Sequence, residues 1–329
     1  MRLPLPAWPA FAFGCLALMA ANAAPPAWEK LPDLPQSTGG AAAGLLDGQV
    51  TLIGGATWRD GRKIWLATAQ RFDDHARRWT AADLLTEPHA HGLVAVYGGR
   101  LLLLGGTTGT RPFAGIWSLG PGGEVQRTEA GLPEAAVIST GAQVGMKLIF
   151  AGGTDDVANM RAFTDRAHSF DLASGRLSPL PPYPPGPFGL AAAAALGGEL
   201  LVFGGAAWDR NADRLTDLAD AQAFDPRSVR WRALRPLPVA TRGATALALD
   251  ERWIYVAGGY AAADGFTARA WLYDGRTDTY RDAPSLPVRS VVTLLVAHGQ
   301  VYCLGGEDRP QHRSAEAHRI ALDALRPAR

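Results

Sequence analysis

Six apolar runs along this chain each end in a pair of glycines, and this repeat constrains the fold more than any other feature. The steps between successive pairs are 51, 47, 52, 54 and 47 residues. Another apolar stretch and a short turn precede each run, which is typical of paired antiparallel strands. A repeat of about 50 residues, built from short strands, predicts an all-β ring of packed sheets. The glycine pairs are Gly54-Gly55, Gly105-Gly106, Gly152-Gly153, Gly204-Gly205, Gly258-Gly259 and Gly305-Gly306.

Aromatic residues recur at fixed places after the glycines. An aromatic-Asp pair comes first in most repeats, as in Phe72-Asp73 and Tyr273-Asp274, and a further aromatic residue such as Trp79, Trp231 or Tyr280 follows it. A Leu-Pro-rich link then leads to the next repeat. The glycines permit close backbone approach, and the last aromatic residue fills the space between neighbouring sheets. Each repeat therefore predicts one unit of short strands packed against its neighbours.

This pattern resembles the kelch repeat over essentially the whole chain from residue 24 onward. The resemblance implies a six-bladed kelch-type β-propeller, with residues 24–329 as one domain. Trp28 stands in an outer-strand segment with no repeat before it, whereas the last repeat ends in "RPAR" without such an aromatic residue. We therefore expect the segment around Trp28 to supply the outer strand of the last blade and close the ring.

The first 23 residues indicate an exported protein. A basic residue, Arg2, precedes an apolar stretch that ends in Ala21-Asn22-Ala23, a small-residue cleavage site. This pattern predicts a signal peptide, residues 1–23, and a periplasmic or secreted protein. A lipoprotein signal ending at Cys15 is the weaker alternative. No later stretch is long and apolar enough to predict a membrane span.

Charge and cysteine content exclude several partner classes. The chain has 32 basic and 31 acidic residues, and cleavage after Ala23 removes only Arg2 from this set. A balanced charge carries no electrostatic signature for nucleic acid or an anionic membrane. Cleavage also leaves Cys303 as the only cysteine, so an intrachain disulfide is excluded. Cys303 lies in an apolar run and is predicted to be a buried structural thiol.

The topology of such a blade brings two sets of loops to one face. In an up-and-down sheet, the loops that begin at the glycine pairs and the links into the next inner strand emerge on the same side. Binding residues are usually carried by loops on a rigid scaffold. The glycine loops carry Trp58, Trp208, Glu307 and Arg313, and the links carry His89, His91, Arg242 and Arg289.

Each of these candidates has a structural and a functional interpretation. Trp58 and Trp208 recur at the same offset from their glycines, so they either cap the repeat or stack on a sugar. His89 and His91 have no third ligand nearby in sequence, which argues against a metal site. Arg242, Arg289 and Arg313 are suited to a carboxylate, or they form a surface ion-pair network. These interpretations stay open at this stage.

Glu307 distinguishes the last repeat from the others. It is the only acidic residue that directly follows one of the six glycine pairs of the repeat, and Arg313 comes six residues later. The Gly306-Glu307 pair with this arginine resembles the motif of the bacterial sialic acid mutarotases (N-acetylneuraminate epimerases). The resemblance implies a catalytic Glu307 and Arg313, with Arg242, Arg289, Trp58, Trp208, His89 and His91 as candidate substrate-binding residues.

Such a mutarotase interconverts the anomers of a carboxylated sugar. The sugar ring opens, rotates and closes on its other face, which requires a proton to move between the anomeric hydroxyl and the ring oxygen. A positioned carboxyl group performs this kind of acid–base work, and no metal or organic cofactor is expected. The alternative is a propeller without catalysis that binds a glycan or a protein partner.

Overall fold

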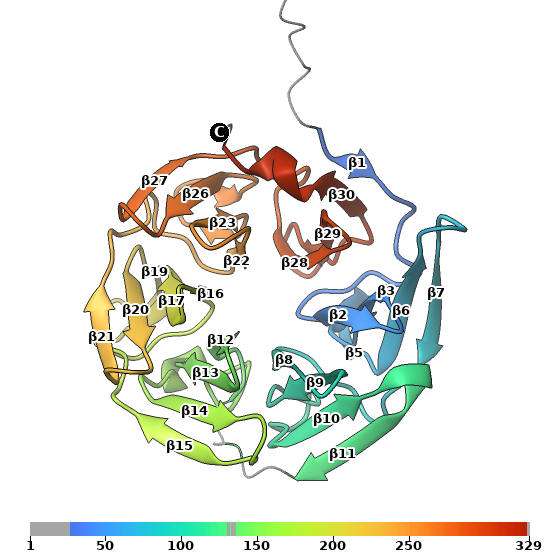
Figure 1. Ribbon diagram of the computed structural model, residues 1–329, viewed down its shortest axis with the longest axis horizontal. Helices are drawn as coiled ribbons and strands as arrows, with labels where there is room; N and C mark the ends of the chain where they lie inside the picture. The colour runs from blue at the N-terminus through green and yellow to red at the C-terminus, as the bar shows by residue number, and fades with distance from the viewer. Residues whose placement is uncertain (1–26, 130–131, 133–135, 328–329) are drawn as a thin grey trace, which may run out of the picture.

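The computed structural model describes residues 27–129, 132 and 136–327. Within them, six four-stranded antiparallel sheets surround a central axis (Figure 1). The protein is thus an all-β six-bladed propeller, as predicted. The proposed signal peptide, residues 1–23, lies outside the described residues. No helix in the described part of the chain is long and apolar enough to cross a membrane.

Blades one to three follow one another along the chain, each with its first strand nearest the axis. Blade one contains β2 (Ala42–Leu46), β3 (Gln49–Ile53), β6 (Thr68–Asp73) and β7 (Arg78–Asp83). Blade two contains β8 (Leu93–Tyr97), β9 (Arg100–Leu104), β10 (Gly115–Leu119) and β11 (Val125–Glu129). Blade three contains β12 (Thr140–Val144), β13 (Lys147–Ala151), β14 (Ala167–Asp171) and β15 (Leu177–Leu180).

Blades four to six complete the ring. Blade four contains β16 (Ala192–Leu196), β17 (Glu199–Phe203), β20 (Ala221–Asp225) and β21 (Arg230–Ala233). Blade five contains β22 (Thr245–Ala248), β23 (Trp253–Ala257), β26 (Ala270–Asp274) and β27 (Thr279–Asp282). Blade six contains β28 (Val291–Ala297), β29 (Gln300–Glu307), β30 (Ala317–Ala321) and, from the start of the chain, β1 (Glu29–Lys30).

Two-stranded hairpins and short 3₁₀ helices lie outside the six four-stranded sheets. Two-stranded hairpins extend the glycine loops of blades one, four and five: β4 (Ala56–Arg59) with β5 (Arg62–Trp65), β18 (Ala206–Asp209) with β19 (Arg214–Asp217), and β24 (Tyr260–Ala261) with β25 (Gly265–Phe266). Three short 3₁₀ helices are η1 (Pro121–Gly123), η2 (Met160–Ala162) and η3 (Leu322–Leu325). The hairpins matter most here, because they rise from the loops on which the site residues were predicted.

The apolar core lies between the blades. Each of six buried clusters joins side chains of two neighbouring sheets, so that the cluster between blades six and one includes Tyr302 and Leu52. Successive side chains of a strand point to opposite faces, and an inner strand therefore contributes to the clusters on both sides. This double burial explains why the second strands read as continuous apolar runs such as "LLLL".

The N-terminal strand closes the ring as predicted. In β1, Glu29 pairs with Arg319 of β30, and the Arg319 guanidinium donates to the Glu29 carboxylate at 2.6 Å. Trp28 donates its indole N–H to the carbonyl of Ser285, at 2.9 Å, in the link before blade six. Trp79 and Trp231 make the same bond to the links before their own blades, with Pro32 and Pro181. Trp28 therefore occupies the position of the outer-strand aromatic residue in the last blade.

Candidate functional site

The glycine pairs fix each loop against the following blade. In blade one, Gly54 and Gly55 both have positive φ angles, and the Gly55 N–H donates to the carbonyl of His89 at 2.8 Å. A Cβ on Gly54 would lie 2.0 Å from that carbonyl oxygen, so a side chain is excluded there. Gly306 makes the equivalent bond to the carbonyl of Thr38 at 2.8 Å. The loop that begins at Glu307 is therefore held beside the start of blade one.

Glu307 and Arg313 form an ion pair across this loop. The Arg313 guanidinium lies 3.1 Å from Oε2 of Glu307 and donates to the carbonyl of His312 at 2.9 Å. The Arg313 side chain is only 8% exposed, against 33% for Glu307. No described residue makes a hydrogen bond to Oε1 of Glu307 or to the buried Nε of Arg313. The predicted pair thus exists, with one carboxylate oxygen available to a ligand.

Two glycines of blade one make room for this pair and for a histidine. A Cβ on Gly39 would lie 2.6 Å from Cδ of Arg313, and a Cβ on Gly40 would lie 2.3 Å from Cε1 of His91. Both side chains therefore rest directly on the backbone of the link into β2. The sequence analysis did not select these glycines, because their role depends on side chains from blades two and six.

Residues with positive φ form an inner rim where the links enter the first strands. Gly40, His91, Ile138, Leu190 and Gly243 all have φ between 57° and 69°. The rim is joined across blades: His91 donates its N–H to the carbonyl of Gly40 at 2.9 Å, and Ile138 donates to that of His91 at 3.1 Å. His91 is the only polar side chain among these five. Its positive φ places it outside the regular strand conformation, in the link before β8.

His91 is neutral at neutral pH. Burial lowers its pKa to about 3, and the nearby positive charges of Lys63 and Arg313 act in the same direction. Its ring also makes an edge contact with Trp65, with 6.1 Å between the ring centroids. A neutral imidazole offers one donor and one acceptor. His91 is therefore suited to hydrogen bonding with a ligand and not to providing a cation.

A cavity of about 400 Å³ lies over this rim on the side of blades four, five, six and one. It brings together three of the predicted charged residues, Glu307, Arg313 and Arg242, with His91. Most of its remaining wall is backbone or apolar. The lining residues are Gly39, Gly40, His91, Leu190, Arg242, Gly243, Tyr260, Phe266, Val291, Glu307, Pro310 and Arg313.

The blade-five wall of the cavity carries a neutralised cation. Arg242 forms an ion pair with Asp217 of the β18–β19 hairpin, and its guanidinium lies 4.1 Å from the ring centroid of Tyr260. The Asp217 side chain is 3% exposed and also accepts a bond from the N–H of Ala262 at 2.7 Å. Phe266 packs edge-on against Tyr260, at 5.3 Å between centroids. Arg242 thus lines the cavity with its charge already paired.

The other predicted residues lie around the cavity without lining it. His89 is buried, its Nε2 lies 2.9 Å from the carbonyl oxygen of Gly105, and burial lowers its pKa to about 4. Arg289 is exposed and donates to the carbonyl of Phe266 at 3.1 Å. Trp58 and Trp208 are half-buried at equivalent places on the hairpins of blades one and four, and Arg161 lies 4.9 Å from the Trp208 ring.

The β4–β5 hairpin contributes residues that the sequence analysis missed. Trp65 packs against His91, and Lys63 lies over the ring of Trp65 with 4.1 Å from Nζ to the centroid. Trp58 pairs with Lys63 across the hairpin. Two tryptophans on either side of the short turn "RDGR" are the signal that would have indicated a hairpin here.

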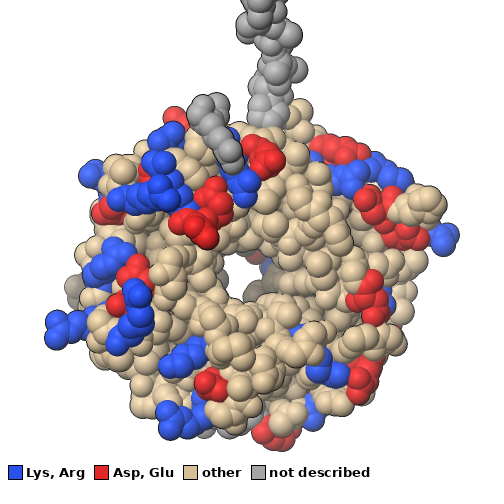
Figure 2. All heavy atoms as spheres, viewed as in Figure 1, with Lys and Arg blue, Asp and Glu red and all other residues tan. Residues whose placement is uncertain are grey.

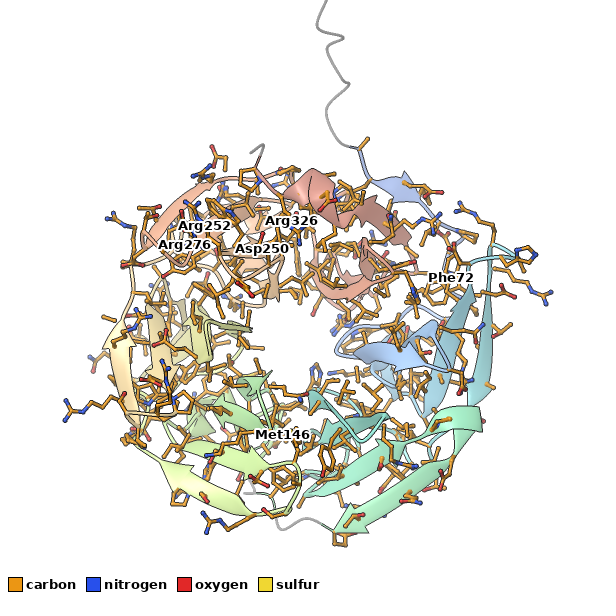
Figure 3. All side chains as sticks on the ribbon, viewed as in Figure 1. Phe72, Met146, Asp250, Arg252, Arg276 and Arg326 are labelled. Carbon is orange, nitrogen blue, oxygen red and sulfur yellow. The ribbon has the colours of Figure 1, made fainter. Side chains whose placement is uncertain are left out.

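The opposite face has a different character. The space-filling view shows that face with an open channel through the ring, uncharged residues around the channel and charged side chains spread around the periphery (Figure 2). Asp250, Arg252, Arg276 and Arg326 cluster beside blade five (Figure 3). Arg252 is paired with the buried Asp274 at 2.6 Å and holds the pKa of that carboxyl group well below its usual range. Arg326 lies 3.4 Å from Asp250, so Arg252 and Arg326 both have carboxylate partners.

Among the described residues, no group of three or more His, Cys, Asp or Glu side chains is arranged to hold a metal ion. Cys303 is a buried free thiol with its pKa raised by burial.

Comparison with known proteins supports the kelch character of the repeats. No family model matches the chain. Over 165 residues, 49% of its length, the chain is 32% identical to Kelch-like protein 35 of Mus musculus, and the match covers 25% of that protein. The chain thus spans about a quarter of the length of this relative. Together with the six sheets, this similarity identifies the chain as a six-bladed propeller of kelch repeats.

Proposed function

We propose that this protein is a mutarotase for a carboxylated sugar, of the kind acting on N-acetylneuraminate. The observation that carries the proposal is the position of Glu307 in the cavity at the axis, held through one oxygen by Arg313. Anomer interconversion needs one group that takes a proton from the anomeric hydroxyl and returns a proton to the ring oxygen. A carboxylate with a free oxygen in a confined cavity meets this need.

The reaction proceeds through Glu307 alone as proton carrier. Glu307 accepts the anomeric proton while the bond between the anomeric carbon and the ring oxygen breaks, and the ring oxygen then receives the proton. The open-chain ketone rotates, and the same transfers in reverse close the ring on its other face. His91 is neutral, so it orients the sugar by hydrogen bonds and supplies no proton. Arg313 fixes the carboxylate and limits its rotation.

The apolar parts of the wall suit the non-polar face of a sugar ring. Tyr260 and Phe266 present aromatic surface in the cavity next to the polar group at Glu307. Ligand cavities commonly combine a mostly apolar lining with a few placed polar groups. The volume of about 400 Å³ lies within the range of small-molecule sites.

The decisive experiment follows the anomers directly. N-acetylneuraminate released freshly as its α anomer is monitored by NMR with and without the protein. The proposal requires that the protein accelerate conversion to the β anomer. Binding without acceleration would leave a glycan-binding propeller that lacks catalysis, and no binding of any keto sugar acid would remove the sugar-acid function.

We also propose that the protein is exported and works without a cofactor. N-terminal sequencing of the exported form would then begin near Ala24, and metal analysis of active protein would find no stoichiometric ion. A retained leader, or activity that a chelator abolishes, would contradict this part of the proposal.

A further inference from the structure

Lys63 stands beside the cavity on the hairpin of blade one. It pairs with Trp58 across the hairpin, and its ammonium group lies 4.1 Å from the centroid of Trp65. Residues that are two apart on a strand share a face, so Lys63 and Trp65 lie on the same side of β5. The hairpin is held to the link of blade one by bonds between Ala56 and Gly39 at 2.9 and 3.0 Å. Lys63 is therefore placed by the same segment that supports Arg313.

The charge of Lys63 acts on the cavity residues. Burial lowers the pKa of Lys63, the positive charge of Arg313 lowers it further, and the negative charge of Glu307 opposes the decrease. Lys63 in turn contributes to the lowered pKa of His91. The contacts place the ammonium group next to the cavity: Lys63 lies over Trp65, and Trp65 makes an edge contact with His91, which lines the cavity together with Glu307 and Arg313.

No carboxylate of the described residues lies within ion-pair distance of Lys63. Arg313 has Glu307 as its partner at 3.1 Å, and Arg242 has the buried Asp217. The positive charge of Lys63 is thus the one left uncompensated in the group formed by these five residues. A half-buried cation without a partner favours an anionic ligand, because the ligand supplies the missing charge.

We propose that Lys63 binds the carboxylate of the ligand and gives the site its preference for acidic sugars. This rests on the proposed sugar-acid ligand but not on catalysis. Contact with the face of Trp65 holds the ammonium group while leaving N–H donors for the carboxylate oxygens. Arg313 is then a positioning residue for Glu307. The sequence analysis suggested that Arg313 binds a carboxylate. We assign this role to Lys63, which lies on another blade.

The test compares an acid with its ester, using probes that do not mutarotate. Binding of the methyl glycoside of N-acetylneuraminate and of its methyl ester is measured by calorimetry. Wild type is expected to prefer the acid by about ten- to a hundredfold, the range of one hydrogen bond to a charged group. Lys63→Met retains the stem against Trp65 and is expected to bind both probes equally weakly. Lys63→Arg should keep most of the preference.

The matched control is Arg62→Met, which removes the exposed neighbouring charge on the same hairpin. It should leave the preference intact, and thermal melting of each variant checks that the hairpin remains folded. If Lys63→Met discriminates acid from ester as strongly as wild type, another residue binds the carboxylate and the proposal is overturned while the mutarotase function stands. If wild type binds neither probe, the sugar-acid function fails and the role of Lys63 fails with it.

Discussion

The two walls of the cavity contain the same kinds of residue but differ in how their charges are paired. On the wall of blades six and one, Glu307 and Arg313 pair with each other, and Lys63, which stands beside this wall, has no carboxylate partner among the described residues. On the wall of blade five, Arg242 is neutralised by Asp217 and packed on Tyr260. A cation that lines a cavity is thus available to a ligand only when the protein itself does not satisfy it. We call the wall that carries Glu307 and Arg313 the chemical wall and the wall that carries Arg242 and Tyr260 the packing wall. The two walls differ in how their charges are paired and not in how many arginines they contain.

The largest expected effect is at Glu307. Glu307→Gln retains the size and hydrogen bonding of the side chain but cannot carry the proton, so the rate of anomer conversion should fall by about 10²–10⁴. NMR of freshly released α-N-acetylneuraminate measures this rate. Glu316→Gln, which removes a carboxylate outside the cavity, is the control and should retain the wild-type rate. Equal activity of the Glu307 variant would move the chemistry to another group.

The second prediction tests whether Arg242 can bind a ligand once its counter-charge is removed. Asp217→Asn leaves Arg242 without its counter-charge, and a carboxylated ligand should then bind several-fold more tightly. Removing one partner of a buried pair costs about 3–5 kcal/mol, and the Arg242 side chain is 25% exposed; we therefore expect a smaller loss of stability, about 1–3 kcal/mol. Urea unfolding and calorimetry measure the two effects.

A control on blade four tests whether the gain is local. Asp213→Asn removes an exposed carboxylate of the neighbouring turn, which is paired only with the exposed Arg161, and should change neither stability nor affinity beyond about 0.5 kcal/mol. If Asp217→Asn weakens binding of the carboxylated ligand, then the ion pair with Asp217 is not the reason that Arg242 does not bind the ligand in wild type.

The repeat allowed the fold to be predicted because each glycine pair meets the same steric demand. Gly54 and Gly305 both lie against the backbone of the link into the next blade, where a Cβ would be 2.0 Å from the carbonyl oxygen of His89 and 2.6 Å from that of Thr38. A side chain is therefore excluded at both positions. Closure of the ring by the segment around Trp28 could also be predicted from the sequence, because the last repeat lacks an outer-strand aromatic residue. Such features are local and recur six times along the chain.

The site was only partly predictable because it is assembled from different blades. Glu307 was visible as a departure from the repeat. Lys63 and the partner of Arg242 were not, because hairpin conformation decides which charges meet. His91 was assigned correctly to a link, but the positive φ that places its side chain on the rim could not be predicted from the sequence. Sequence spacing determines which residues share a face, but not which side chains neutralise one another.

The third prediction concerns pH and the two histidines near the chemical wall. The folded pKa values of His89 and His91, about 4 and 3, lie below the ordinary value of 6.5. The unfolded chain therefore binds more protons below pH 6.5, and stability should decline as pH falls from 6.5 toward 3. Each histidine contributes at most about 1.4 kcal/mol per pH unit. Urea unfolding at several pH values gives the free energy of unfolding as a function of pH, and this free energy should fall less steeply with decreasing pH in His91→Gln than in wild type. An equal pH dependence in the variant would mean that His91 is exposed to water.

The smallest expected effect is at Arg289, beyond the edge of the packing wall. Its guanidinium is exposed and donates to the carbonyl of Phe266, so it touches the cavity only through that residue. Hydrogen bonds of exposed groups contribute little, and we expect Arg289→Ala to change ligand affinity by no more than about twofold, within about 0.5 kcal/mol. Calorimetry with the methyl glycoside of N-acetylneuraminate measures this. A loss as large as that expected for Lys63→Met would show that blade five also supplies an available cation, and the contrast between the two walls would then disappear.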